Sequence, residues 1–177
     1  MAAPRRPDGD GVEGTIVFTD LVGFTEFTAL SGDDAALELL ATQSRLVDEV
    51  LPPDARVVKE LGDGLLLYFP DPAEAVRAGL DLQRTFEAES ESTGMPLWIR
   101  VGMHAGAFRE RGRDLVGHDV NVAARIVDVA GAGEVLVSDA VRRDAQPRVP
   151  TVEFVELGPV VMKGIPDPIR LWRASCP

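Results

Sequence analysis

Residues 15–20 read Thr-Ile-Val-Phe-Thr-Asp, and this stretch decides the fold. β-branched and aromatic residues in one continuous run are typical of a buried strand. The run ends in an acidic residue, Asp20, and Gly23 follows three positions later. The stretch therefore predicts a central strand whose end carries a carboxylate and leads into a turn.

Two helices are predicted after this strand, over residues 23–29 and 33–51. In the second, apolar residues recur at helical spacing, Asp33 or Asp34 is expected as the N-cap, and two prolines at 52–53 stop the helix. We expect this helix to pack on the core.

Residues 56–61 and 65–69 are two further strand-like runs. Gly62-Asp63-Gly64 joins them, and glycines permit the positive φ angles of a tight turn, so a hairpin is predicted. The later predicted elements are a helix over 71–89, a strand over 97–104, an Arg-rich loop over 108–113, a helix over 119–130, short strands around Val135, Phe154 and Val160, and a closing strand over 169–173.

This order of elements predicts an α/β sandwich. Its core is a ferredoxin-like βαββαβ unit, with both helices on one face of a mixed, mainly antiparallel sheet and with extra C-terminal strands. The length of 177 residues fits one domain over residues 14–177. Residues 1–13 are rich in Pro, Gly and charge and are expected to form a flexible N-terminal tail.

The charge balance excludes some classes of partner. The chain carries 18 Lys and Arg against 29 Asp and Glu, a net charge of −11. Nucleic acids and anionic membranes bind clustered positive charge, so we expect neither as a partner. No apolar run approaches the ~18 residues of a membrane span, and the lone Cys176 cannot form an internal disulfide. These features predict a cytoplasmic protein.

Two aspartates are the strongest candidates for a chemical site. With residues 15–20 and the hairpin at the centre of the sheet, Asp20 and Asp63 come side by side at one edge. Adjacent carboxylates repel each other unless a cation lies between them, so the pair predicts a divalent metal site. A purely structural role also fits, in which Asp20 caps the next helix and Asp63 forms the turn.

A helix start follows the first aspartate directly. Gly23, Phe24 and Thr25 open this helix, and the unpaired N–H groups of a helix start can hold phosphate oxygens. Every helix has such a start, so the signal gains weight only from the acidic site beside it.

The helix predicted over 119–130 carries a second candidate group. Asn121 and Arg125 are four residues apart and share one face of it. Arginine binds charge spread over phosphate oxygens, and asparagine can orient a ribose oxygen. A solvated polar face would show the same pattern. His104 and His118 have no further His or Cys at metal-ligand spacing and are expected to be structural.

Four segments, in order, carry a resemblance to a known family. They are FTDLVGFT at 18–25, KELGDG at 59–64, RDLVGHDVNVAAR at 113–125 and VMKGIPDP at 161–168. They resemble the signature segments of class III adenylyl and guanylyl cyclases, over about residues 15–173. The resemblance implies the fold predicted above and the conversion of ATP to 3′,5′-cyclic AMP and pyrophosphate. The short loop between Gly106 and Asp114 resembles the compact-arm bacterial subgroup.

The resemblance also implies the metal and purine sites. Asp20 and Asp63 would hold two divalent cations, Mg²⁺ or Mn²⁺, and the Leu21 carbonyl would join one of them. Lys59 and Asp114 would be the pair that reads the purine.

Further residues would act on the ribose and the phosphates. Asn121 would orient the ribose, Arg125 would stabilise the pentavalent phosphorus, and Lys163 would bind phosphate. An arginine that grips the triphosphate is expected in the loop after Gly106, where the candidates are Arg109, Arg111 and Arg113.

The spacing of these residues favours a shared site. Lys59 lies four residues from Asp63 on the other side of a turn, so both side chains can hardly reach one small substrate. A head-to-tail homodimer resolves this conflict, because the aspartates of one chain then face Lys59 and Arg125 of its partner in two equivalent sites. ATP and a second copy of the chain are the expected partners.

Other protein classes fit less well. A phosphoreceiver domain needs alternating strands and helices, whereas the last forty residues predict successive strands. A diguanylate cyclase needs a Gly-Gly-acidic-acidic-Phe loop, which the sequence lacks. A guanylyl cyclase typically carries Glu and Cys where this chain has Lys59 and Asp114. The alternative outside the enzymes is a silent nucleotide-binding dimerisation module, marked by loss of a metal aspartate, Asn121 or Arg125, and none of these is lost.

Overall fold

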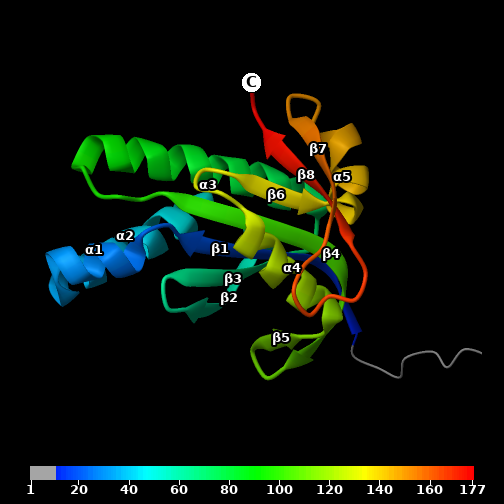
Figure 1. The fold of residues 1–177 in the computed structure, drawn as a ribbon, viewed down its shortest axis with the longest axis horizontal. Helices are drawn as coiled ribbons and strands as arrows, with labels where there is room; N and C mark the ends of the chain where they lie inside the picture. The colour runs from blue at the N-terminus through cyan, green and yellow to red at the C-terminus, as the bar shows by residue number, and fades with distance from the viewer. Residues whose placement is uncertain (1–10) are drawn as a thin grey trace, which may run out of the picture.

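The computed structural model describes residues 11–177 and is built around one eight-stranded sheet (Figure 1). The elements in chain order are β1 (Gly11–Leu21), α1 (Phe24–Ser31), α2 (Asp33–Val50), β2 (Arg56–Leu61), β3 (Gly64–Phe69), α3 (Pro72–Thr93), β4 (Ile99–Arg111), β5 (Asp114–Val116), α4 (His118–Val129), β6 (Val135–Ser138), α5 (Asp139–Ala145), a 3-10 turn (Gln146–Arg148), β7 (Glu153–Val160) and β8 (Ile169–Ser175).

The order of the strands confirms the ferredoxin-like core. It runs β2-β3-β1-β4-β6-β8-β7, and β5 pairs with β4. β1 lies between β3 and β4 and is antiparallel to both, whereas β4 and β6 are parallel. The sheet is therefore mixed and mainly antiparallel, and β6, β7 and β8 are the extra C-terminal strands.

Helices cover the two faces of the sheet unequally. α2, α3 and α5 pack on one face, in a core that includes Val17, Leu67 and Val101 of the strands. α4 packs on the other face, against Ile16 and Phe18. Because side chains alternate along β1, Asp20 belongs to the same face as Ile16 and Phe18. The α4 face thus carries the first candidate aspartate.

α4 lies directly on β4 at one glycine. A Cβ added to Gly102 would be 2.3 Å from the backbone nitrogen of Val127, so a side chain at this position would push the helix off the sheet. This contact sets the height of the helix that carries Asn121 and Arg125.

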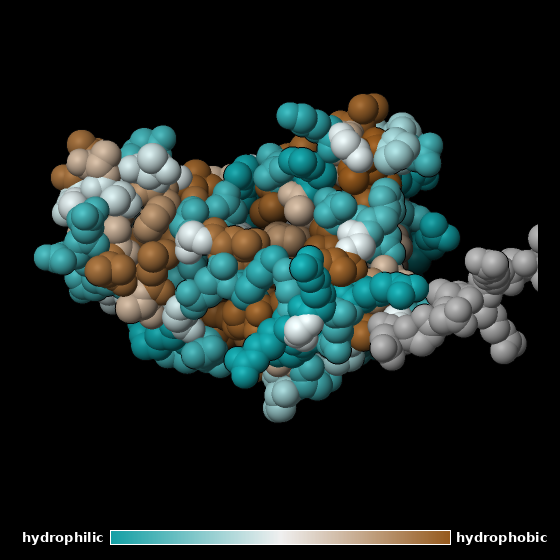
Figure 2. Space-filling model, turned by 90° about the horizontal axis from the view of Figure 1, so that it is seen from below, coloured by the Kyte–Doolittle hydropathy of each residue, from teal (hydrophilic) through white to brown (hydrophobic). Residues whose placement is uncertain are grey.

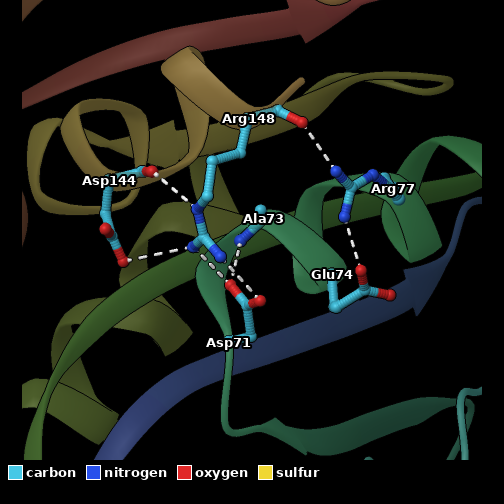
Figure 3. A network of polar contacts seen from close by, with 6 residues as sticks. All are labelled: Asp71, Ala73, Glu74, Arg77, Asp144 and Arg148. Carbon is cyan, nitrogen blue, oxygen red and sulfur yellow. Dashed lines mark hydrogen bonds and ion pairs between the residues drawn. The ribbon is translucent and has the colours of Figure 1, made fainter.

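A polar network on the opposite face joins α3 to the segment after α5 (Figure 3). Asp71 caps α3 through the Ala73 amide at 2.9 Å, and Arg148 donates two hydrogen bonds to its carboxylate, at 2.8 and 2.5 Å. The guanidinium of Arg77 in turn reaches the Arg148 carbonyl at 2.6 Å. The network fastens the α5 region to the start of α3 and takes no part in the candidate site.

Several predicted boundaries are wrong. Gly32, not Asp33 or Asp34, is the N-cap of α2. Both aspartates lie in the first turn of the helix, where their negative charge interacts favourably with the helix dipole. The first strand begins at Gly11 rather than Thr15, while residues 1–10 of the predicted tail lie outside the described residues.

The predicted loop over 108–113 is also wrong. β4 extends to Arg111 and turns into β5, because its polar end pairs with the start of β1 and with β5. These backbone hydrogen bonds stabilise a strand that has little side-chain burial to reveal it in the sequence.

Near the C-terminus, one strand and one helix differ from expectation. Phe154 and Val160 belong to the single strand β7, which shifts register between Glu156 and Gly158. α5 was not predicted, because seven residues are too few for a clear helical period.

The surface holds apolar side chains at the α1–α2 end, at the left of Figure 2, where Leu30 and Leu37 are exposed. Within residues 11–177, no helix combines the length and the apolar composition needed to span a membrane.

Candidate functional site

The two predicted metal aspartates lie together. Asp20 is next to the last residue of β1, and Asp63 is in the turn between β2 and β3. β3 pairs antiparallel with β1, with Thr19 opposite Leu65, so the turn lies beside the end of β1. Gly64 permits the close approach, since a Cβ there would be 3.0 Å from the Thr19 carbonyl oxygen.

The electrostatics of the pair fit a cation site. The pKa of Asp63 is raised from 3.8 to about 6. Partial burial is the largest cause, and the hydrogen bond to Asp20 and repulsion from the charge of Asp20 add to it. Within the described residues, no group of three or more His, Cys, Asp or Glu side chains could hold a metal ion. A cation here would rely on the two carboxylates and on backbone or substrate oxygens, which is the oxygen-rich donor set that Mg²⁺ and Mn²⁺ prefer.

Arg100 is the cation beside these aspartates, and the sequence did not indicate it. Its Nε and Nη2 donate to Oδ2 of Asp20 at 2.9 and 2.6 Å, because the two residues are direct partners on β4 and β1. The available signal was that Arg100 is the single charged residue in the strand predicted over 97–104.

The arginines expected in the loop lie elsewhere. Arg109 pairs with Gly11, nine residues along β4 from the Asp20–Arg100 pair, which is roughly 30 Å at the rise of a strand. Arg111 and Arg113 lie further on in the β4–β5 hairpin. Within one chain, the arginine at the aspartates is therefore Arg100.

Lys59 and Asp114 also meet, although 55 residues separate them. Lys59 Nζ on β2 donates to Asp114 Oδ2 on β5 at 2.8 Å, and this hydrogen bond lowers the pKa of Asp114. Both residues line a groove of about 620 Å³ with Asn121 and a wall of apolar side chains that includes Phe18 and Leu66. The structure thus brings the expected purine pair and the expected ribose residue together.

The groove lies over the N-terminal half of α4, whereas the Asp20–Arg100 pair contacts its C-terminal end, and Phe18 and Leu61 of the groove wall are each two residues from one of the aspartates. The groove is lined at this helix by Gly117, His118, Val120, Asn121 and Ala124, whereas Arg100 Nη1 donates to the Asp128 carbonyl near the helix C-terminus at 3.3 Å. The helix has 12 residues and is about 18 Å long. Neither Asp20 nor Asp63 lines the groove, so one chain presents two separate half-sites.

Arg125 is not placed in the groove beside Asn121. It donates to Asp128 Oδ2 at 3.1 Å, and both side chains are about half exposed. A surface ion pair of this kind is worth little, so Arg125 is free to take another partner at small cost.

The remaining candidates flank these half-sites. α1 begins at Phe24, one residue after the predicted start, and Gly23 at φ 77° is its N-cap, so the amides of its first turn follow soon after Asp20 and Leu21. Thr25 is exposed in that turn. Lys163 is exposed in the loop between β7 and β8, outside the groove, although its neighbour Met162 packs against α4.

His104 holds the start of α4 in place. Its Nδ1 is 2.7 Å from Ser138 Oγ, and its Nε2 is 3.2 Å from Asp119 Oδ1, while the other oxygen of Asp119 accepts from the Ala107 amide at 2.8 Å. Burial lowers the pKa of His104, which favours the neutral ring. Gly106 makes room for this arrangement, since a Cβ there would overlap the Asp119 carboxylate. His118 begins α4 and borders the groove.

The raised pKa of Asp63 predicts a pH dependence. The folded chain holds the carboxyl proton of Asp63 more tightly than the unfolded chain does. Protonated Asp63 therefore contributes its full stabilisation of the folded state below pH 3.8, and this contribution is lost as the pH rises through about 6. A cation must displace the same proton, so Mn²⁺ affinity should weaken as the pH falls below about 6. Calorimetric Mn²⁺ titrations at pH 5 and 7.5 test this, and an affinity equal at both values would contradict it.

Known proteins resemble this chain in sequence and in fold. The sequence model described as the adenylate and guanylate cyclase catalytic domain matches residues 11–173. A pH-sensitive adenylate cyclase of Mycobacterium tuberculosis is 32% identical over 162 residues, which are 90% of this chain and 40% of that protein. An adenylate cyclase of Streptomyces griseus is 35% identical over 128 residues, which are 72% of this chain and 31% of that protein. The chain therefore spans less than half the length of both relatives.

A solved structure agrees with the fold. The adenylate/guanylate cyclase/hydrolase of Silicibacter pomeroyi has a TM-score of 0.80 at 28% identity, with 94% of this chain and 98% of that chain covered.

Proposed function

This chain belongs to the class III adenylate and guanylate cyclase catalytic domains, and we propose that it is an adenylyl cyclase that converts ATP to 3′,5′-cyclic AMP and pyrophosphate. The observation that carries the choice of ATP is the Lys59–Asp114 pair, which lies beside Asn121 in the groove. An ammonium donor and a carboxylate acceptor match the ring nitrogen and the amino group of adenine. The adenylate cyclases among its relatives support this choice.

Asp20, Asp63 and the Leu21 carbonyl would hold two divalent cations, Mg²⁺ or Mn²⁺. When bound, these supply a lowered pKa of the ribose 3′-hydroxyl and a clamp on the α-phosphate. The carboxylates fit that charge because a cation offsets both the burial and the mutual repulsion that raise the pKa of Asp63.

The other residues bind and orient the nucleotide. Asn121 directs the ribose, and Arg125 leaves its weak partner Asp128 to stabilise the charge that develops on the phosphorus. The first-turn amides at Gly23, Phe24 and Thr25 hold phosphate oxygens, and Lys163 adds a flexible positive charge from the β7–β8 loop.

The two half-sites require a second copy of the chain. Neither aspartate lines the groove that holds Lys59, Asp114 and Asn121, and the reaction needs ATP to contact both, so one chain offers each substrate only half of its contacts. A head-to-tail dimer joins the aspartate end of one chain to the groove of its partner and forms two equivalent sites.

Mixed dimers test this sharing. An Asp63→Ala chain and an Arg125→Ala chain should each be inactive alone, but a mixed dimer has one site with both defects and one with neither. After full subunit exchange, half of the dimers are mixed, so about a quarter of the wild-type activity should return. Differently tagged chains allow purification of the mixed dimer.

A mixed dimer without activity would show that each chain builds its own site. That result would also explain the ion pair that holds Arg125 near the Arg100 end of α4. An Asp63→Ala chain mixed with another Asp63→Ala chain is the matched control and should stay inactive.

The reaction itself is tested by incubating the pure chain with Mn²⁺ and either ATP or GTP and separating the products. Cyclic AMP from ATP is expected. Cyclic GMP as the main product would favour the guanylyl cyclase alternative. Nucleotide binding with no cyclic product would favour the silent module.

A further inference from the structure

The Arg100–Asp20 ion pair is one of the less exposed ion pairs of the described residues, and it is the one that involves a candidate metal aspartate. It joins residues 80 positions apart on neighbouring strands, and both side chains are only 28% exposed. By comparison, the Arg45–Glu49 pair joins residues four positions apart on one helix, with exposures of 50% and 54%. The partly buried pair is screened less by water and salt, so its strength exceeds that of a surface pair.

The pair divides the two oxygens of the Asp20 carboxylate. Oδ2 accepts both hydrogen bonds from Arg100, while Oδ1 lies toward the β2–β3 turn, 3.9 Å from where a Gly64 Cβ would be. Asp63 is in that turn. A third bond, from Arg100 to the Asp128 carbonyl, anchors the guanidinium to the end of α4.

We propose that Arg100 is a resident counter-ion of the aspartate pair, which competes with a divalent cation for Asp20 and so sets how tightly the site binds that cation. This inference rests on the proposed function, which makes Asp20 and Asp63 the metal ligands. A cation that uses both oxygens of Asp20 must displace two charge-assisted hydrogen bonds. Arg100 therefore weakens cation binding in the absence of nucleotide.

The competition has a consequence for binding order. A guanidinium displaced from Asp20 stays beside the site through its Asp128 contact and is available to an anionic ligand. By linkage, any anion that takes over the guanidinium strengthens cation binding by the same factor by which the cation strengthens anion binding. The site then fills with cation and anion together.

Titration with Mn²⁺ alone, followed by the electron paramagnetic resonance of the free ion, tests the competition without turnover. Arg100→Met should bind Mn²⁺ at least about tenfold more tightly than the wild type, which is the scale of a single hydrogen bond to a charged group. The matched control Arg45→Met also removes an ion-paired arginine, but on α2, which packs on the other face of the sheet, and should leave the affinity unchanged. Equal affinity in Arg100→Met and wild type would overturn the proposal.

Two further variants test whether the positive charge of Arg100 alone weakens Mn²⁺ binding, and whether the extra Mn²⁺ binds at Asp63 or elsewhere. Arg100→Lys keeps the charge but loses the two-bond geometry, so it should bind Mn²⁺ more tightly than the wild type. Wild-type affinity in this variant would overturn the proposal. Adding Asp63→Asn to Arg100→Met should remove the extra Mn²⁺ binding, and persistence of that binding would place the cation elsewhere.

The test of cyclic nucleotide formation and the test of competition between Arg100 and Mn²⁺ can fail independently. Tighter Mn²⁺ binding in Arg100→Met together with an absence of cyclic nucleotide in the wild type would reject the proposed function and keep the competition. Cyclic AMP formation with unchanged Mn²⁺ binding would do the reverse. Thermal unfolding in EDTA verifies folding, and Arg100→Met should melt lower than the wild type and recover with Mn²⁺.

Discussion

Asp63→Asn is expected to abolish cyclisation and at the same time to stabilise the protein when EDTA removes metal. The variant loses a metal ligand, and the loss of activity should reach at least ~10³-fold, since two-metal stabilisation of the transition state is worth several kcal/mol. At pH 8 it also removes a negative charge that is partly buried and repelled by Asp20, so the melting temperature should rise by about 2 °C.

Asp20→Asn should lose activity to the same extent but should melt below the wild type. Its carboxylate is the partner of the half-buried Arg100, and removing one member of such a pair leaves an uncompensated charge. The melting temperature should thus rise in Asp63→Asn and fall in Asp20→Asn, and these opposite signs distinguish the two aspartates. A purely structural cap and turn would predict loss of stability without the ~10³-fold loss of activity.

Cyclic nucleotide formation with Mn²⁺ and thermal unfolding in EDTA are the two measurements. Asp81→Asn is the matched control, because Asp81 is an exposed acid paired with Arg84 on the opposite face of the sheet, and it should keep wild-type activity. Substantial Mn²⁺-dependent activity in either Asp20→Asn or Asp63→Asn would contradict the metal assignment.

A strong preference for ATP over GTP is the second large effect expected. Adenine offers an amino donor and a ring-nitrogen acceptor, which match the Asp114 carboxylate and the Lys59 ammonium. Guanine would set its carbonyl against the carboxylate and leave polar groups unpaired. Sites that read hydrogen bonds reject the wrong partner by as much as ~10⁴ in kcat/KM.

Lys59→Glu combined with Asp114→Cys should erode or invert this preference. The measurement is kcat/KM for both nucleotides in the wild type and the double variant. A matched control is Arg56→Glu with Glu110→Arg, because this ion pair is a neighbouring exposed link between β2 and β4 at 2.9 Å that lies outside the groove. Comparable kcat/KM for ATP and GTP in the wild type would show that Lys59 and Asp114 do not read the purine.

Local sequence determined the central strand, the hairpin and the meeting of Asp20 with Asp63. Hydrophobic pattern and turn chemistry act over a few residues, and an antiparallel neighbour then places the turn beside the end of the strand. The four family segments likewise assigned Lys59, Asp114 and Asn121 to one ligand, and the groove contains all three.

Only the tertiary structure decided which charges meet across the sheet. Arg100 reaches Asp20 through the β1–β4 register, and Arg109 lies at the far end of the same strands, a difference that no local pattern encodes. The division into two half-sites depends on where α4 lies, and this depends on Gly102 and on the His104–Asp119 contact. Those contacts join elements far apart in the chain, so their geometry exists only once the sheet and helix have packed.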